Sequence, residues 1–149
     1  MIRMQHLIAI IFVASASFSY AADTTPSSSG PSWQGEAQKE IKEKNYDGAI
    51  KTLLAANEPN SADWNNLLGY AQRKKTPPNL NAAEFYYQAA LMIDPKHKGA
   101  LEYYGELLLM KNNLPGAEQM LARLDKVCFF SCEEYRDLKE AIAKYKTKK

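Results

Sequence analysis

The chain has few of the residue types from which catalytic and metal sites are built. Its 149 residues include two cysteines and two histidines, and one of these histidines, His6, lies in the N-terminal segment. Two thiolates do not complete a metal site, and the other histidine, His97, is far from them in the sequence. Nucleophile-elbow and phosphate-binding glycine patterns are also missing. We therefore expect no enzymatic activity, no metal and no cofactor.

An excess of charge of one sign is missing as well. The formal net charge is +2, whereas proteins that bind nucleic acid by neutralising phosphates concentrate Lys and Arg on one surface. Only the C-terminal residues from Lys144 onward are locally basic, and a solvated helix end accounts for such a tail. The composition therefore predicts no binding to nucleic acid and no membrane contact through this tail.

A hydrophobic run long enough to cross a bilayer is absent too. The run from Leu7 to Ala14 has eight residues, which in a helix span about 12 Å against a hydrocarbon core of roughly 30 Å. Arg3 before this run and the small residues around Ala21 are typical of a cleaved secretory signal. We expect residues 1–21 to be removed and the mature chain to be periplasmic or secreted, with 18 basic and 17 acidic residues remaining.

The rest of the chain divides into a short leader and one helical domain. Residues 22–32 are rich in Ser, Thr and Pro without apolar periodicity, which predicts a flexible leader. From Trp33 onward, apolar residues recur at spacings of three and four, which indicates helices rather than strands. We place the helical domain at residues 33–146 and a basic tail at 147–149, because the length leaves no room for a second core.

The helical domain contains an internal repeat. Ala49, Ala83 and Ala117 are each separated by 34 residues. A small residue precedes each alanine in a first helix, and a bulky residue follows it after four positions. These residues are Ala37, Gly69 and Gly105, and Leu53, Tyr87 and Leu121. Since small residues let two helices approach closely, we expect the glycines at helix contacts, with Tyr87 and Leu121 filling the space beside them.

This pattern resembles the tetratricopeptide repeat family. The second copy carries the most complete signature, with the residues Leu68-Gly69, Ala83, Tyr87, Ala90 and Pro95. The resemblance covers about residues 33–127. The first copy departs from it by lacking the Leu-Gly pair, and the third has Leu124 where alanine is usual. The resemblance implies an all-α solenoid of about three helix pairs.

A final helix is expected to close this solenoid. Ser131 and Glu134 have the Ser-x-x-Glu spacing of a capping box, in which a side chain at the helix start binds the backbone three residues on. The helix that follows carries apolar residues on one face, namely Tyr135, Leu138, Ile142 and Tyr145. We expect this face to cover the exposed side of the last helix pair, as terminal units of solenoids do.

The two cysteines flank the turn into this capping helix. Cys128 and Cys132 are the only cysteines of the chain. Because exported compartments are oxidising, we expect a disulfide between them, with two buried free thiols as the alternative.

By the same resemblance, the partner surface is the inner face formed by the first helix of each pair. The positions used for binding in the family correspond here to Asn66, Tyr70, Arg73, Lys74, Glu102, Glu106, Leu109 and Met110. One subset of the family grips a C-terminal carboxylate, but the corresponding positions here hold Leu67, Gly99 and Tyr103, so we expect no such clamp. The alternatives are that these residues only solvate the helices, or that the capping helix fills the hollow.

The resemblance implies a protein–protein interaction module. The leading hypothesis is a periplasmic or secreted adaptor that binds a protein or peptide segment on its concave face and has no small-molecule substrate. The alternative is a structural component that self-associates, or packs into a larger envelope complex, through its convex or end surfaces. Fold alone does not choose between them.

Overall fold

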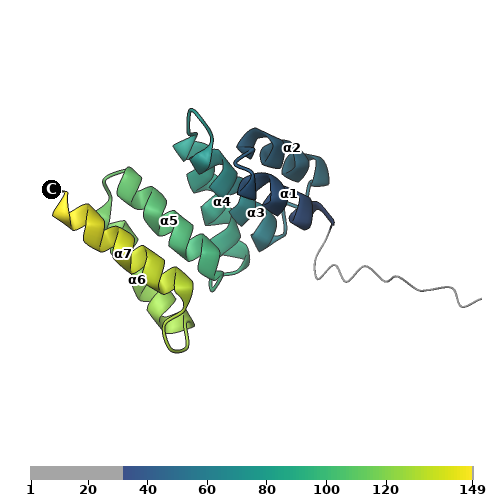
Figure 1. The fold of residues 1–149 in the computed structure, drawn as a ribbon. Coiled ribbons are helices and arrows are strands. Elements are labelled where there is room, and N and C mark those ends of the chain that lie inside the picture. Colours follow the sequence, from purple (N-terminus) through teal and green to yellow (C-terminus); the bar gives the residue numbers. More distant parts are fainter. Residues whose placement is uncertain (1–31, 149) are drawn as a thin grey trace, which may run out of the picture.

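Seven α-helices follow one another along residues 32–148, the part of the chain that the computed structural model describes. In order they are α1 (Ser32–Lys42), α2 (Tyr46–Ala56), α3 (Ala62–Lys74), α4 (Leu80–Ile93), α5 (Lys98–Met110), α6 (Leu114–Val127) and α7 (Glu133–Thr147). No strand occurs within these residues. The predicted all-α solenoid of three helix pairs and a final helix is therefore confirmed (Figure 1).

The structure describes residues 32–148, so the predicted boundaries near the two termini can be compared with it only in part. The expected signal segment, 1–21, and all but the last residue of the expected leader, 22–32, lie outside them. Ser32, which we assigned to the leader, is the first residue of α1. Thr147, assigned to the basic tail, is the last residue of α7.

The second helix of every pair begins with the same capping interaction. The side-chain oxygens of Asn45, Asn79 and Asn113 each accept a hydrogen bond from the backbone N–H three residues on, at 3.0 to 3.1 Å. These bonds satisfy backbone donors that a helix start otherwise leaves free. The three asparagines are spaced by 34 residues, so the repeat extends to the signals that start its helices.

His97 caps a first helix rather than standing free in a turn. Its Nδ1 accepts a hydrogen bond from the backbone N–H of Ala100 at 3.0 Å, at the start of α5. Nδ1 must then be unprotonated, so the Nε2 of the neutral ring donates its hydrogen to Asp63 Oδ1, 2.9 Å away in α3. One imidazole thus starts α5 and ties it to the preceding pair.

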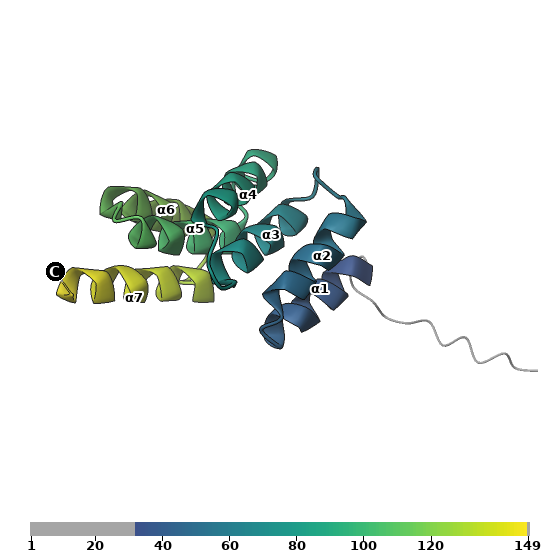
Figure 2. The same ribbon diagram turned by 90° about the horizontal axis from the view of Figure 1, so that it is seen from above.

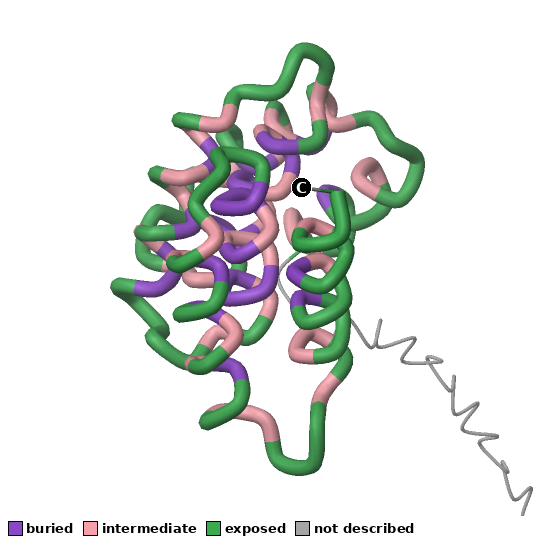
Figure 3. Tube along the Cα trace, turned by 90° about the vertical axis from the view of Figure 1, so that its left-hand side faces the viewer, coloured by how far each residue is buried: buried purple, intermediate pink, exposed green. Residues whose placement is uncertain are grey.

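The pairs stack with their first helices on one side of the molecule. Figure 2 shows α5 between α6 and α7, and α4 on the same side of α3 as α6 is of α5. Buried residues gather where the helices face one another, whereas the connecting turns are mostly exposed (Figure 3). Three apolar clusters result, one for each junction along the stack. The inner side is therefore a surface of first helices alone.

A tryptophan fixes the first junction. Trp64 of α3 is buried beside Ala37, Leu53 and Leu68. Its indole N–H donates a hydrogen bond of 2.6 Å to the carbonyl oxygen of Leu53, a group near the end of α2. This bond satisfies a polar atom inside an apolar cluster, which favours one arrangement of α2 against α3.

The two glycines of the repeat make different contacts. A Cβ atom on Gly69 would lie 2.7 Å from ring carbons of Tyr87, the residue expected beside it. A Cβ atom on Gly105 would lie 2.6 Å from Leu138 in α7, and the three nearest atoms all belong to that side chain. Gly105 therefore makes room for the final helix, whose Leu138 lies nearest to it, while Leu121 packs against the same apolar cluster.

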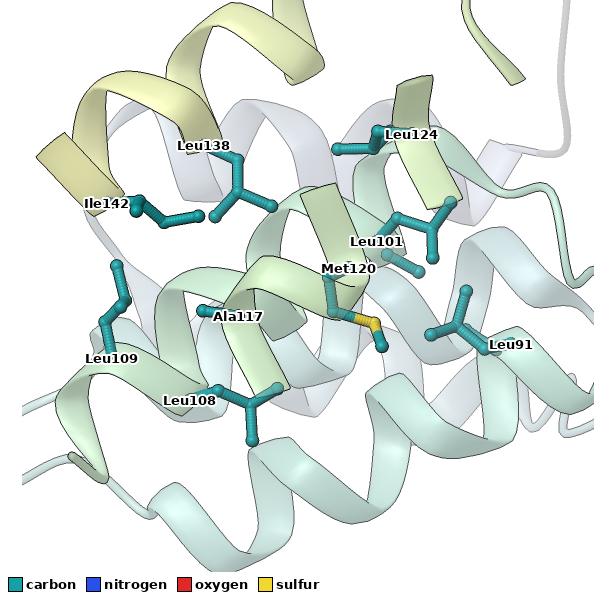
Figure 4. Packing of buried hydrophobic residues seen from close by; sticks show 11 residues of the cluster. Leu91, Leu101, Leu108, Leu109, Ala117, Met120, Leu124, Leu138 and Ile142 are labelled. Carbon is teal, nitrogen blue, oxygen red and sulfur yellow. The ribbon is translucent and has the colours of Figure 1, made fainter. Parts of the chain in front are cut away.

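The final helix covers the last pair as predicted. Leu138 and Ile142 of α7 are buried in one cluster with Leu109 and Leu124, and Tyr135 and Tyr145 pack against its edge. Figure 4 shows Leu138 beside Leu124 of α6, and Leu138 and Ile142 above Leu108 and Leu109 of α5. Because this face meets α5 as well as α6, α7 occupies the place of a first helix in a further pair.

The predicted capping box is wrong. Helix α7 begins at Glu133, so Cys132 holds the N-cap position, and its side chain makes no capping hydrogen bond. Ser131 lies one residue before the N-cap and has a φ of 61°, in the left-handed region. The tight turn between α6 and α7 turns the Ser131 backbone away from the geometry that a capping serine needs.

No helix among the described residues is both long and apolar enough to traverse a bilayer.

Candidate binding groove on the inner helices

A hollow of about 320 Å³ lies on the inner side of the solenoid. Its lining comes from all four first helices: Gln38 and Ile41 of α1, Asn66, Leu67 and Tyr70 of α3, Gly99, Glu102 and Tyr103 of α5, and Glu134 of α7. Helices far apart in the sequence therefore contribute to one concave surface. We call this surface the inner groove.

Arg73 is a buried structural residue in contact with Tyr70 and Tyr103, two residues that line the inner groove. Only 7% of it is exposed. Its guanidinium forms an ion pair of 2.7 Å with Glu106, and its Nε donates a hydrogen bond of 3.3 Å to the Tyr87 hydroxyl. Burial acts to lower the pKa of Arg73, but Tyr87 and Glu106 outweigh it and the pKa is raised. The charges of Arg73 and Glu106 thus neutralise one another within the solenoid and do not point to contact with a binding partner.

Tyrosine rings form a row from the start of α2 across the inner helices α3 and α5. The ring of Tyr70 lies 4.8 Å from that of Tyr103 and 6.5 Å from that of Tyr46, measured between centroids. Arg73 contacts the faces of Tyr70 and Tyr103 at 5.5 and 5.6 Å, and Lys74 contacts Tyr70 at 5.7 Å. Such rigid rings provide contact area at low cost in conformational entropy.

Glu102 is a buried carboxyl group in this surface. Only 7% of it is exposed. Its pKa is raised to about 8, first by burial and then by the nearby carboxylates of Glu106, Asp137 and Glu134, with Arg73 acting in the opposite direction. At neutral pH the group therefore retains its proton most of the time. The pKa of Tyr103 is also raised, to about 12, first by burial and next by the nearby negative charge of Glu102.

Asn66 carries a buried acceptor without a partner. The residue is 8% exposed and lines the hollow beside Gly99. Its Oδ1 accepts no hydrogen bond from residues 32–148. A buried polar atom without a partner is costly, and native proteins rarely leave one. Asn66 therefore indicates a position where a ligand donates a hydrogen bond.

The sequence-predicted residues divide into four groups. Asn66, Tyr70 and Glu102 line the hollow, whereas Arg73 and Glu106 form the ion pair beneath it. Lys74 and Met110 are exposed, and Leu109 is buried in the apolar cluster with Ile142 of α7 (Figure 4). The capping helix therefore covers part of the inner face of α5, where we expected a partner.

Several lining residues were missed because no copy of the repeat pointed to them. Gln38 and Ile41 lie in the first copy, which lacks the Leu-Gly pair that set our register. Glu134 lies in a helix that we interpreted only as a cap. Leu67, Gly99 and Tyr103 were considered for a carboxylate clamp, and they do line the hollow. They offer it apolar and aromatic surface rather than positive charge.

The turn before α7 brings the two cysteines together. The structure joins the sulfur atoms of Cys128 and Cys132 across a loop whose tip, Phe129 and Phe130, is exposed. Glu134 lies near them, and these three are the one group of potential metal ligands found among residues 32–148. Joined sulfurs are not thiolate ligands, so the geometry favours a covalent link over a metal site. The disulfide itself stays a prediction.

The repeat signature is confirmed by comparison with protein families. Residues 79–142 match the sequence model of the tetratricopeptide repeat. These residues belong to the tetratricopeptide repeat family. The match runs from the N-cap of α4 into α7, and it includes the first helix α5 with Glu102. No curated protein sequence matches the chain.

Solved structures share the tetratricopeptide repeat arrangement over most of the chain. The translocator chaperone SycD of type III secretion in Yersinia enterocolitica superposes with a TM-score of 0.67 and 18% identity, over 78% of this chain and 82% of that one. SycD in complex with a peptide of the translocator YopD gives 0.63 and 18% identity, over 78% and 91%. At this identity the likeness establishes the fold alone.

Proposed function

We propose that this protein is a non-enzymatic adaptor that holds a segment of another protein in the inner groove. The observation that carries the proposal is the hollow of about 320 Å³ to which α1, α3, α5 and α7 all contribute. It combines tyrosine rings, apolar side chains and an acceptor on Asn66 that has no partner among the described residues. A peptide offers the matching groups, which are apolar side chains and backbone N–H donors.

The structural neighbours support this proposal. One of the superposed SycD structures holds a peptide of a translocator. A shared fold does not transfer a ligand, but it shows that a solenoid of this size can present a peptide-binding surface. The partner proposed here is likewise a protein or peptide rather than a small molecule.

The absence of turnover rests on how the polar groups are used. Both ring nitrogens of His97 are engaged, one by the Ala100 N–H and the other by Asp63. The guanidinium of Arg73 is paired with Glu106 and Tyr87. These groups hold the solenoid together, and none of them is arranged as a base beside a nucleophile.

We also propose that the adaptor works outside the cytoplasm. The support is the charged, apolar and small-residue pattern of residues 1–21. The closeness of Cys128 and Cys132 agrees with an oxidising compartment. Edman sequencing of the mature protein should begin at Ala22, and an intact N-terminus in the purified exported protein would contradict this.

A structural role through the outer surface is the second candidate. Phe85 and Met92 of α4 are 65% and 84% exposed, and they lie on a second helix away from the inner groove. Apolar side chains this exposed are candidates for contact with another protein. In this case the chain associates with itself or with a larger complex through its convex side.

Two matched substitutions distinguish these functions. Ile41→Arg places a charge at the wall of the inner groove, whereas Leu54→Arg places one on the outer helix α2, where Leu54 is also exposed. Dodecapeptides selected on the wild-type protein by phage display should bind the Ile41→Arg variant at least about tenfold more weakly and the Leu54→Arg variant unchanged. Equal binding of the peptides to both variants would refute the inner groove as the binding surface.

The outer surface has a test of its own. Dimers that form with rising protein concentration in light scattering, and that are abolished by Phe85→Ser and Met92→Ser together, would favour the outer surface.

A further inference from the structure

Acidic groups gather at one end of the inner groove. Glu102 and Glu134 line the hollow from α5 and α7, and Glu106 and Asp137 lie near enough to Glu102 to repel its negative charge. Arg73 acts against this repulsion, but Glu106 already pairs with it. Glu102, Glu134 and Asp137 form no ion pair within residues 32–148. The residues that line the hollow include two glutamates and no lysine or arginine.

The unpartnered acceptor lies in the lining of the same hollow. Asn66 is more than nine-tenths buried, and its Oδ1 has no donor in the described part of the chain. This observation is independent of the acids, and it calls for a group that donates hydrogen bonds.

Apolar and aromatic side chains make up much of the remaining lining. Ile41, Leu67, Tyr70 and Tyr103 line the hollow together with the amide of Gln38. The group that suits such a space has an apolar stem and several donors at a charged tip, which describes the side chains of lysine and arginine. A carboxylate or a wholly apolar side chain would leave the acceptor and the acids without a partner.

We propose that the inner groove selects a basic side chain, lysine or arginine, in the segment that it holds, with the cationic tip between Asn66 Oδ1 and the carboxylates of Glu102 and Glu134. This inference rests on the proposed adaptor function. It adds the chemical class of the residue that is recognised and the end of the groove at which it is bound.

The protonation of Glu102 agrees with this arrangement. Burial and the surrounding carboxylates raise its pKa to about 8, so near neutral pH it gains full charge only when a cation offsets them. A basic side chain that enters the hollow lowers this pKa, and a proton is released. Affinity for a basic segment should therefore rise as the pH increases from 6 to about 9.

The probe is a set of acetylated and amidated decapeptides in which each position in turn is fixed as lysine, arginine, norleucine, glutamine or glutamate. Binding to the mature chain is measured by fluorescence polarisation. At one position, the lysine or arginine peptides should bind at least about tenfold more tightly than the norleucine peptides. In Glu102→Gln and in Glu134→Gln the ratio should fall to about twofold or less.

Glu140→Gln is the control, because Glu140 lies on α7 but is exposed and does not line the hollow. It should keep the wild-type preference. Glu134 is only partly buried, so its variant remains informative if Glu102→Gln folds poorly. Peptides that bind without a basic preference, or a preference that survives both glutamine variants, would overturn this inference and leave the adaptor function standing. Failure of every peptide to bind would overturn both.

Discussion

The backbone of Gly69 lies against the ring of Tyr87, so that a Cβ atom at residue 69 would stand 2.7 Å from two ring carbons. Tyr87 is fully buried, and its hydroxyl accepts the hydrogen bond from Arg73. The ring therefore cannot move aside without disturbing Arg73, which contacts the lining of the inner groove. The smallest residue of the repeat and its largest buried side chain determine together how closely α3 and α4 approach.

Gly69→Ala should destabilise the protein although alanine favours helices. The added methyl group overpacks the contact with Tyr87, and we expect the free energy of unfolding to fall by about 1 to 3 kcal/mol. Gly35→Ala in α1 is the control, because a Cβ atom there meets nothing within 4 Å. It should raise stability by up to about 1 kcal/mol. Urea denaturation measures both, and a stabilised Gly69→Ala variant would show that the two helices are not in contact there.

Removal of the His97 imidazole should weaken the start of α5. His97→Ala loses the acceptor for the Ala100 N–H and the contact with Asp63, and we expect a loss of about 1 kcal/mol in thermal unfolding. Asparagine caps helices well, so His97→Asn should recover much of this loss. Equal melting temperatures for His97→Ala and wild type would contradict the capping role.

Glu102→Gln should change the pH dependence of stability. The folded-state pKa of Glu102 is raised to about 8 from an ordinary value of 4.5, so unfolding releases a proton between these pH values and stability falls as the pH rises through them. A neutral glutamine removes this loss. We expect the variant to gain about 2 kcal/mol over wild type between pH 5 and pH 9, less than the full shift because the adjoining hollow admits solvent. Parallel stability curves for the two proteins would refute this.

The bond between Cys128 and Cys132 should contribute modestly to stability. Closing so short a loop is worth about 2 kcal/mol on the chain-entropy model, so the double variant Cys128→Ser and Cys132→Ser should unfold at lower urea concentration. Alkylation of the native mature protein followed by mass spectrometry tests the bond directly. Two alkylated cysteines without reductant would show that the thiols are free.

The order of the helices could be predicted from the sequence because the repeat records local contacts. Ala83 and Ala117 mark the second helices, and the spacing of 34 residues places each pair. The path of α7 is a different matter, since it depends on how Leu138 fits against Gly105 across a turn with residues in the left-handed region. The Ser-x-x-Glu spacing predicted a capping box at Ser131. The conformation of that turn explains why Ser131 does not cap α7.

The candidate site was predicted in part for the same reason. Asn66, Tyr70 and Glu102 follow from the register of the repeat, because neighbouring first helices place equivalent positions on one face. Leu109 does not, because its burial is decided by α7, which lies outside the register. The pairing of Arg73 with Glu106 also depends on the distance between two helices, which a one-dimensional pattern does not contain.

The asparagine caps make each unit of this molecule interchangeable with the next. Asn79-Leu80 and Asn113-Leu114 present the same two residues at the same helix start. A second copy of residues 79–112 inserted before Asn113 would therefore meet a native junction at both ends. The molecule can be lengthened by one helix pair without redesigning a boundary, and a longer chain would carry a correspondingly longer inner groove.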